Sequence, residues 1–218
     1  MDAVEARTKG QRDPDRTREL IIDAATTLFS QRGFDGATAD DIARAAGVNK
    51  AMINYHFRGK EGLYRTILDE ILGRVADELQ AIARAPLSSQ ERLGRYLDVF
   101  AALHRERPAT SALLMREVLS GGRFLEATML TRFLAVFRSI QSILAVGAAD
   151  GSFQSVEPLM THLTIMGGLM FFFASAPFRE RLLAAAPIAI TPPTADDFIA
   201  HLKHLLAHGL SRPEGESR

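Results

Sequence analysis

A tight turn around Gly47 separates two short helical patterns, and it constrains the fold of this chain more than any other feature. Thr38 is a suitable N-cap for the first helix, and the second is expected to run from about Asn49 to Tyr55. Ala43 is small enough for two helix backbones to approach closely, and Gly47 readily adopts the left-handed conformation that such a turn requires. Two helices joined this closely predict a helix-turn-helix.

Amphipathic helices are expected on both sides of this pair. A first helix is expected to begin near Pro14 and to stop at Gly33, because apolar residues recur with helical spacing over 21–29. A further helix is expected to begin at about Lys60 and to end before Pro86. The N-terminal part of the chain is therefore predicted to be a three-helix unit followed by a linking helix.

Beyond Pro86 the helical period continues and no strand pattern intrudes. Proline and glycine interrupt it at Pro108, Gly121-Gly122, Asp150-Gly151, Pro177 and the Pro187 to Pro193 loop. Helices are expected at about 88–105, 109–120, 123–147, 156–176 and 195–209. The predicted fold class is all-α, with an N-terminal helix-turn-helix domain and a C-terminal helical bundle.

Charge is neutral overall but unevenly distributed. The 26 basic and 26 acidic residues cancel, so net charge gives no support to a nucleic-acid partner. From Ile42 to Lys60, however, there is no Asp or Glu, while Arg44, Lys50 and Arg58 add positive charge. This segment is predicted to form a local cationic surface.

The sequence favours a cytoplasmic protein with no membrane partner. It contains no cysteine, and its first residues are polar and charged where a secretory signal would need an apolar stretch. The most apolar stretch, 159–174, is shorter than the ~20 residues a helix needs to cross a bilayer. A buried helix explains that stretch better.

A dense, ordered set of residue types extends over about residues 16–64. It comprises Ile22-Asp23-Ala24-Ala25 through Phe29, Gly33-Phe34, Thr38-x-x-Asp41-Ile42-Ala43, Ala46-Gly47-Val48, and Asn54-Tyr55-His56-Phe57-x-x-Lys60-Glu61-Gly62-Leu63. In this order and spacing the set resembles the DNA-binding domain of the TetR family of transcriptional regulators. The rest of the chain resembles that family only in length and helical character.

The resemblance implies a ligand-responsive transcriptional repressor that binds palindromic, double-stranded operator DNA as a homodimer and is released by a small-molecule effector. It implies no enzymatic activity and no cofactor. The corresponding division of the chain is a flexible basic tail over 1–15, the helix-turn-helix DNA-binding domain over 16–60, the linking helix over 61–85, a ligand-binding and dimerisation domain over 86–210, and a flexible tail over 211–218.

Candidate DNA contacts gather at the start of the second helix of the pair. Asn49, Lys50 and Ala51 occupy the end that a helix in the major groove presents to base edges, and Asn54 extends this surface. Many family members have tyrosine where this chain has Asn54, so that contact does not carry over, and asparagine suits adenine instead. The resemblance further implies phosphate or base contacts for Thr38, Tyr55, His56 and Lys60. Arg44 is a further candidate because of its positive charge.

Less specific interpretations stay open for several of these residues. Tyr55 and Phe57 fit simple packing, and Lys50 and Lys60 fit solvated surface charges. The basic residues of the N-terminal region fit either minor-groove and phosphate contacts or a disordered solubilising tail: Arg7, Lys9, Arg12, Arg16 and Arg18.

The C-terminal half contains candidate effector contacts. Phenylalanines and methionines recur there at helical spacing, which suits an apolar cavity but equally suits plain core packing. His104, Arg116 and His162 are polar residues among apolar neighbours, and each needs a hydrogen-bonding partner, which a ligand or another side chain would supply. The combined candidate set is His104, Arg116, Phe133, Phe137, His162, Met166 and Met170.

Three histidines of the last helix suggest a metal site that the helical geometry disfavours. His201, His204 and His208 share one face, but the apolar stripe of that helix lies on roughly the opposite side. We expect a polar face there and no metal.

Dimerisation is expected through the 156–176 and 195–209 helices, with Gly167 and Gly168 allowing close approach. An enzyme is the main alternative class, but the sequence has no P-loop, dinucleotide glycine fingerprint, HExxH or GxSxG motif. An adaptor that kept the helix-turn-helix without using it on DNA is a second alternative. The cationic residues Lys50 and Lys60 argue against it.

Overall fold

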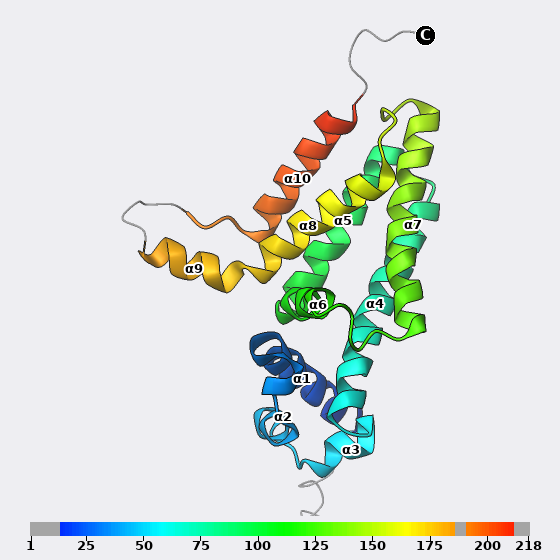
Figure 1. The fold of residues 1–218 in the computed structure, drawn as a ribbon. Helices are drawn as coiled ribbons and strands as arrows, with labels where there is room; N and C mark the ends of the chain where they lie inside the picture. The colour runs from blue at the N-terminus through cyan, green and yellow to red at the C-terminus, as the bar shows by residue number, and fades with distance from the viewer. Residues whose placement is uncertain (1–13, 186–190, 212–218) are drawn as a thin grey trace, which may run out of the picture. The chain divides into compact units, whose positions relative to one another are not determined.

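The computed structural model describes residues 14–185 and 191–211, and these residues are helical apart from short connections, with no strand among them (Figure 1). The all-α fold class is therefore confirmed. The chain divides into two compact units, 1–67 and 68–218, with the boundary inside α4. The helices of the described residues are α1 Pro14–Gly36, α2 Ala39–Ala46, α3 Ala51–Phe57, α4 Lys60–Arg84, α5 Ser89–Glu106, α6 Ala109–Leu119, α7 Ala127–Asp150, α8 Pro158–Ala174, α9 Ala176–Ala185 and α10 Ala195–Leu210.

The first unit is built on apolar residues from four helices. Ile21, Phe29, Ile42 and Ile53 are completely buried, and the Tyr64 ring of α4 meets the Phe29 ring edge on at a centroid distance of 4.9 Å. Such edge-to-face aromatic contacts add to the stabilisation that burial provides. The core of this unit thus fixes α1, α2, α3 and the start of α4 together.

The break at Gly33 is a bend in α1 and not its end. Gly33 has φ 73° and ψ 174°, a conformation that is not helical, yet hydrogen-bonded turns continue to Gly36. The predicted stop at Gly33 is therefore correct as a break in the helical path and three residues early as the end of the element.

The second unit is a helical bundle whose core is centred on α5. This helix starts with a capping box between Ser88 and Glu91 and packs against α6, α7 and α10, while α8 packs against α6 and α7. Tyr96 and Leu97 of α5 and Ile165 of α8 are completely buried. Each of these helices buries one apolar stripe, as the helical periodicity of the sequence predicts.

The predicted start of α7 is four residues early. The carboxylate of Glu117, itself buried, accepts a hydrogen bond from the Phe124 N–H at 2.7 Å. Gly121 and Gly122 both have positive φ, so the backbone leaves the helical path there. This connection keeps 120–126 out of the helix, and α7 begins at Ala127.

Helix α9 is an element that the sequence interpretation missed. Pro177 was expected to end a helix, but it is the second residue of α9, a position where proline costs little because the first helical N–H groups have no partner. None of the α9 residues is buried, and the helix is bent by 59° from α8. A proline that follows one helix closely can therefore mark the start of the next.

The predicted terminal tails fall mostly outside the described residues. Residues 1–13 and 212–218 are in this group, so the interpretations of Arg7, Lys9 and Arg12 are not addressed by the structure. Pro14 and Asp15 belong to the first turn of α1, so the predicted tail is two residues too long. Arg16 and Arg18 are likewise helical.

One helix of the described residues, α7, is long and apolar enough to span a bilayer by length and composition, and α8 with α9 passes the same test only as a bent pair. Helix α7 packs on α5 and α8 and buries Ile140, Ile143 and Leu144. These contacts are those of a core helix.

Candidate functional site

The turn between α2 and α3 has the left-handed geometry that the sequence predicts. Gly47 adopts φ 64° and ψ 36°, and its N–H donates to the Arg44 carbonyl at 3.2 Å. The N–H of Val48 donates to the Ala43 carbonyl at 3.0 Å. These two hydrogen bonds close the last turn of α2 in the manner of a glycine C-cap. The prediction of a tight glycine turn is confirmed.

Helix α3 begins at Ala51, two residues later than predicted, and Asn49 lies just before it and bonds to its first turn. The Asn49 Oδ1 atom accepts a hydrogen bond from the Ala51 N–H at 2.8 Å, and the Asn49 carbonyl accepts one from the Met52 N–H at 2.9 Å. The side chains of Asn49, Lys50 and Ala51 are exposed. Since the Asn49 side-chain acceptor is used in this hydrogen bond, its two amide N–H donors are the groups left for an outside partner.

Helix α3 has one buried and one exposed face. Ile53 is completely buried and Phe57 is 5% exposed, whereas Asn54 is exposed and Tyr55 is 77% exposed. The packing role of Phe57 is confirmed, and the alternative that Tyr55 packs its ring in the core is wrong. A large aromatic ring left in solvent beside exposed polar groups is typical of a binding surface.

His56 lies between these two faces. Its ring meets the Tyr55 ring edge on at 4.9 Å and lies 5.9 Å from the Phe57 ring. The His56 Nε2 atom is buried and has no hydrogen-bond partner among the described residues. A DNA contact by His56 therefore requires its other ring nitrogen or a rotation of the ring.

Acidic residues just outside the 42–60 segment pair with its cations. Lys50 Nζ lies 2.8 Å from Asp40 Oδ2, and Arg44 Nη1 lies 3.0 Å from Asp41 Oδ1. The Thr38 hydroxyl and then the Arg44 guanidinium hold the pKa of Asp41 below its ordinary value. The prediction of a local cationic surface is therefore wrong for these two side chains, because helix α2 places a carboxylate beside each of them. Exposed pairs of this kind contribute only about 0–1 kcal/mol, so a phosphate can replace the carboxylate at small cost.

The two predicted phosphate clamps, Thr38 and Lys60, both have partners inside the protein. Lys60 Nζ donates to the carbonyls of Phe34 and Ala37 at 2.9 and 3.0 Å and lies 4.1 Å from the centroid of the Phe34 ring. Thr38 Oγ1 caps α2 by accepting from the Asp41 N–H at 3.1 Å. The alternative that Lys60 is a solvated surface charge is wrong, and only one of its three N–H donors is left for a phosphate.

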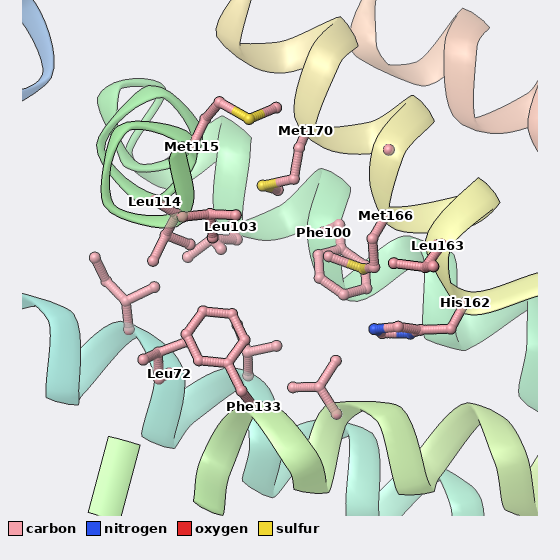
Figure 2. A pocket seen from close by; sticks show the side chains of 15 residues that line it. Leu72, Phe100, Leu103, Leu114, Met115, Phe133, His162, Leu163, Met166 and Met170 are labelled. Atoms are coloured by element: carbon pink, nitrogen blue, oxygen red, sulfur yellow. The ribbon is translucent and has the colours of Figure 1, made fainter. Parts of the chain in front are cut away.

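A cavity of about 330 Å³ lies in the second unit between α4, α5, α6, α7 and α8 (Figure 2). Its size is within the range of small-molecule sites, and its lining is apolar apart from one histidine. The lining residues are Ile71, Leu72, Val75, Phe100, Leu103, Leu114, Met115, Val118, Phe133, Val136, His162, Leu163, Met166, Gly167 and Met170.

The structure brings part of the predicted effector set to this cavity. Phe133 enters from α7, and His162, Met166 and Met170 enter from successive turns of α8 (Figure 2). These positions share one helix face, because residues three or four apart on a helix are neighbours. The sequence pattern therefore located one wall of the cavity.

The other predicted effector residues do not line the cavity. The His104 ring stacks on the Phe173 ring at a centroid distance of 4.2 Å, and Arg116 lies on the exposed side of α6. Phe137 meets the His162 ring edge on at 5.4 Å. In this arrangement a molecule in the cavity would not contact these three residues. Phe137 nevertheless packs against His162, which does line the cavity.

His162 is the polar residue of the lining. Its Nδ1 atom is buried and has no hydrogen-bond partner within the described part of the chain. Burial lowers the pKa of His162 below its ordinary value, so its imidazole is neutral near pH 7. Figure 2 shows the ring extending from α8 into the space that the lining residues enclose.

Several contributors to the cavity escaped sequence reasoning. Ile71, Leu72 and Val75 come from α4, whose apolar stripe was assigned only to a linking role. The buried Tyr96 lies behind the lining, where its hydroxyl approaches the Met166 sulfur at 4.0 Å and burial raises its pKa. The apolar stripe of α4 was a usable signal, but nothing local marks Tyr96, because it depends on how α5 and α8 meet.

The histidines of α10 form a polar face. His201, His204 and His208 are exposed, and His208 Nδ1 lies 2.8 Å from the His204 carbonyl oxygen. Within residues 14–185 and 191–211 the structure has no group of three or more metal-ligating side chains. On the opposite side, Ile199 and Leu202 are buried, but Leu205 is exposed.

Two family models match the chain. Residues 21–67 match the model described as bacterial regulatory proteins, tetR family, and residues 90–187 match the model described as tetracyclin repressor-like, C-terminal domain. The first match covers α2, the Gly47 turn and α3, and the second covers most of the helices that enclose the cavity.

Curated relatives match over most of their length. The chain is 30% identical over 185 residues to the HTH-type transcriptional regulator RutR of Escherichia coli strain K12, which covers 84% of this chain and 86% of that protein. It is 29% identical to the HTH-type transcriptional repressor NicS of Pseudomonas putida strain KT2440, over 91% of this chain and 94% of the relative. Among solved structures, a mutant of the HlyIIR protein matches with a TM-score of 0.62 and 25% identity, over 87% of this chain and 96% of the other.

Proposed function

The chain belongs to the tetR family of bacterial regulatory proteins, and from that premise we propose that it is a cytoplasmic, dimeric repressor whose hold on palindromic operator DNA is released by a small apolar effector. The observation that carries the proposal is the exposed face of α3. Polar and aromatic side chains project from this helix, while Ile53 and Phe57 anchor its other face in the core. A short helix of this form fits the major groove.

We assign recognition of the DNA sequence to the residues at the start of α3. The amide N–H groups of Asn49 and the ammonium of Lys50 are donors for base edges, and the small Ala51 permits close approach or contact with a thymine methyl. Asn54, one turn later and exposed, offers both a donor and an acceptor, which suits adenine.

We assign the phosphate contacts to residues on either side of this surface. Tyr55 offers an exposed hydroxyl and Arg44 an exposed guanidinium, and His56 contributes through the ring nitrogen that is not closed off. Thr38 and Lys60 stand at the starts of α2 and α4, so helix N-terminal N–H groups are available beside them. These contacts position the protein on the duplex and carry no sequence information themselves.

Dimerisation is assigned to α8 and α10. Helix α8 leaves large apolar side chains in solvent, with Met160 61% and Phe171 68% exposed, beside Leu159 and Leu163. A Cβ atom at Gly168 would lie 3.7 Å from Phe198 of α10, and one at Gly167, which lines the cavity, would meet nothing within 4 Å. A twofold four-helix interface buries these groups and spaces two α3 helices for half-sites about 34 Å, or a multiple, apart.

The effector is assigned to the apolar cavity. Ile71, Leu72 and Val75 of α4 line it, and the same helix begins at Lys60 in the DNA-binding unit. A ligand that favours one position of α4 therefore changes the spacing of the two α3 helices. Reversing occupancy of the two states from 99:1 to 1:99 needs about 10⁴-fold tighter binding to the favoured state.

The test is a selection of bound duplexes from random DNA, followed by fluorescence anisotropy on the enriched sequence. We expect a palindromic consensus and a protein dimer on it. Lys50→Ala should weaken binding by about ten- to a hundredfold, the range for loss of one base contact. Arg105→Ala is the matched control, because Arg105 is also exposed and ion-paired, with Asp196 at 2.6 Å, but belongs to α5. Enrichment of no duplex, or equal losses for the two variants, would refute the assignment.

A further inference from the structure

The cavity excludes charged molecules by its composition. Among the fifteen residues that line it there is no Lys, Arg, Asp or Glu. A carboxylate, phosphate or ammonium moved from water into such a lining would lose its hydration without gaining a counter-charge, which strongly disfavours binding. Its occupant is therefore neutral.

One hydrogen-bonding position is nevertheless built into this apolar lining. His162 is the one polar side chain of the lining, and the Phe137 ring packs against its imidazole edge on at 5.4 Å. Its Nδ1 atom is closed off by the surrounding protein, so a molecule in the cavity would bond to the other ring nitrogen, Nε2. A ligand group that bonds to Nε2 is favoured, because no other side chain of the lining is a strong hydrogen-bonding partner. Because the nitrogen is a donor in one tautomer and an acceptor in the other, a hydroxyl, which both donates and accepts, suits it in either form.

The volume limits the size of the molecule. At about 30 Å³ for each water-sized group, 330 Å³ holds about ten non-hydrogen atoms. Phe100 and Phe133 supply flat walls, while Met115, Met166 and Met170 are flexible enough to adapt to the remainder. An alkylated aromatic ring or a medium-length alkyl chain matches these walls.

We propose that the cavity binds a neutral, apolar molecule of about ten non-hydrogen atoms that carries one hydroxyl, and that this hydroxyl bonds to His162 Nε2. The effector class is thus that of alkylphenols and medium-chain alcohols. This inference rests on the proposed function only in taking the cavity as the effector site.

The experiment measures binding to the full-length protein, without DNA, by isothermal titration calorimetry. Three probes share one apolar frame: 4-propylphenol, propylbenzene and 4-propylbenzoate. The phenol should bind about tenfold more tightly than propylbenzene, the ratio that one net hydrogen bond of about 1.4 kcal/mol provides, and the benzoate should not bind. A benzoate that binds as tightly as the phenol would overturn the proposal.

Two variants assign the hydroxyl preference to His162. His162→Leu should reduce the ratio between phenol and propylbenzene to about one, while His162→Gln, which keeps hydrogen-bonding groups, should retain a preference. If His162→Leu does not fold, the ¹⁵N resonance of His162 Nε2 in the wild-type protein replaces it and should shift with the phenol but not with propylbenzene. An undiminished ratio in His162→Leu, or a resonance that neither probe moves, would refute the role of His162.

The same probes separate this inference from the proposed function. If the phenol binds as described but leaves operator affinity unchanged, the ligand class holds and the release mechanism fails. If operator affinity responds to compounds that do not enter the cavity, the ligand class fails while repression stands.

Discussion

Replacement of Lys60 by alanine should destabilise the first unit, although the residue lies in a motif that suggests DNA binding. The wild-type ammonium donates to two carbonyls, of Phe34 and Ala37, at 2.9 and 3.0 Å and lies 4.1 Å from the Phe34 ring centroid. Hydrogen bonds to a charged group contribute about 1.5–3 kcal/mol when well shielded, and a cation–π contact about 0.5–1 kcal/mol. Because Lys60 is half-buried, water recovers part of this, and we expect a loss of about 2–3 kcal/mol.

Urea unfolding followed by far-UV circular dichroism measures this loss. Lys50→Ala is the control, since its exposed pair with Asp40 contributes at most about 1 kcal/mol. Lys60→Met keeps the apolar stem and isolates the ammonium. At a temperature where all variants are folded, Lys50→Ala should weaken operator binding more than Lys60→Ala. If Lys60→Ala is as stable as the wild type and loses as much DNA affinity as Lys50→Ala, the reasoning is refuted, and Lys60 is chiefly a phosphate ligand.

Three further perturbations test other parts of the account. Tyr55→Phe should leave the urea midpoint unchanged, because the ring is 77% exposed. It should weaken operator binding about five- to tenfold through loss of one hydroxyl contact, and an unchanged affinity in fluorescence anisotropy would exclude that contact. Gly47→Ala should lower the free energy of unfolding by about 1–2 kcal/mol because of its φ of +64° alone, since a Cβ there meets nothing within 4 Å. Gly209→Ala in α10 should instead raise the free energy of unfolding by up to about 1 kcal/mol. Calorimetric melting curves in which both variants change stability in the same direction would contradict this. Burial, with Arg179 nearby in the case of His104, lowers the pKa of His104 and His162 in the folded state, so the unfolded chain takes up protons first as pH falls below about 6.5. The free energy of unfolding should therefore decline between about pH 7 and pH 5, and less steeply in His162→Gln; a value independent of pH in this window would show that the native state does not favour neutral imidazoles.

Local rules predicted the fold where the determining chemistry is local. The left-handed turn at Gly47, the cap at Thr38 and the stripe that buries Ile21 all depend on residues within one or two helical turns. The family resemblance added the function that these elements serve. The resemblance did not predict the position of the cavity, because the recognised motifs lie in residues 16–64 and not in the C-terminal half.

The predictions are wrong or incomplete where the structure depends on residues distant in the sequence, or where a residue fits two alternative roles. Pro177 suits both the end of one helix and the first turn of another, and only the following residues of α9 select the second. The pairing of Lys50 with Asp40 crosses the α2 to α3 turn, so a count of charges along 42–60 could not find it. The walls that α4 and α6 give the cavity depend on helix packing, which periodicity alone does not specify.

The central claim, that the N-terminal end of α3 lies against duplex DNA, is open to one direct measurement. The chain contains no cysteine, so Ala51→Cys introduces a single thiol that carries a photoactivatable crosslinker, and Ser142→Cys on the exposed side of α7 gives the matched control. On the selected duplex, position 51 should crosslink to bases within each half-site and lose this crosslink when effector is added, while position 142 should give none. Equal crosslinking from both positions, or none from position 51 on a duplex that the protein demonstrably binds, would contradict the account.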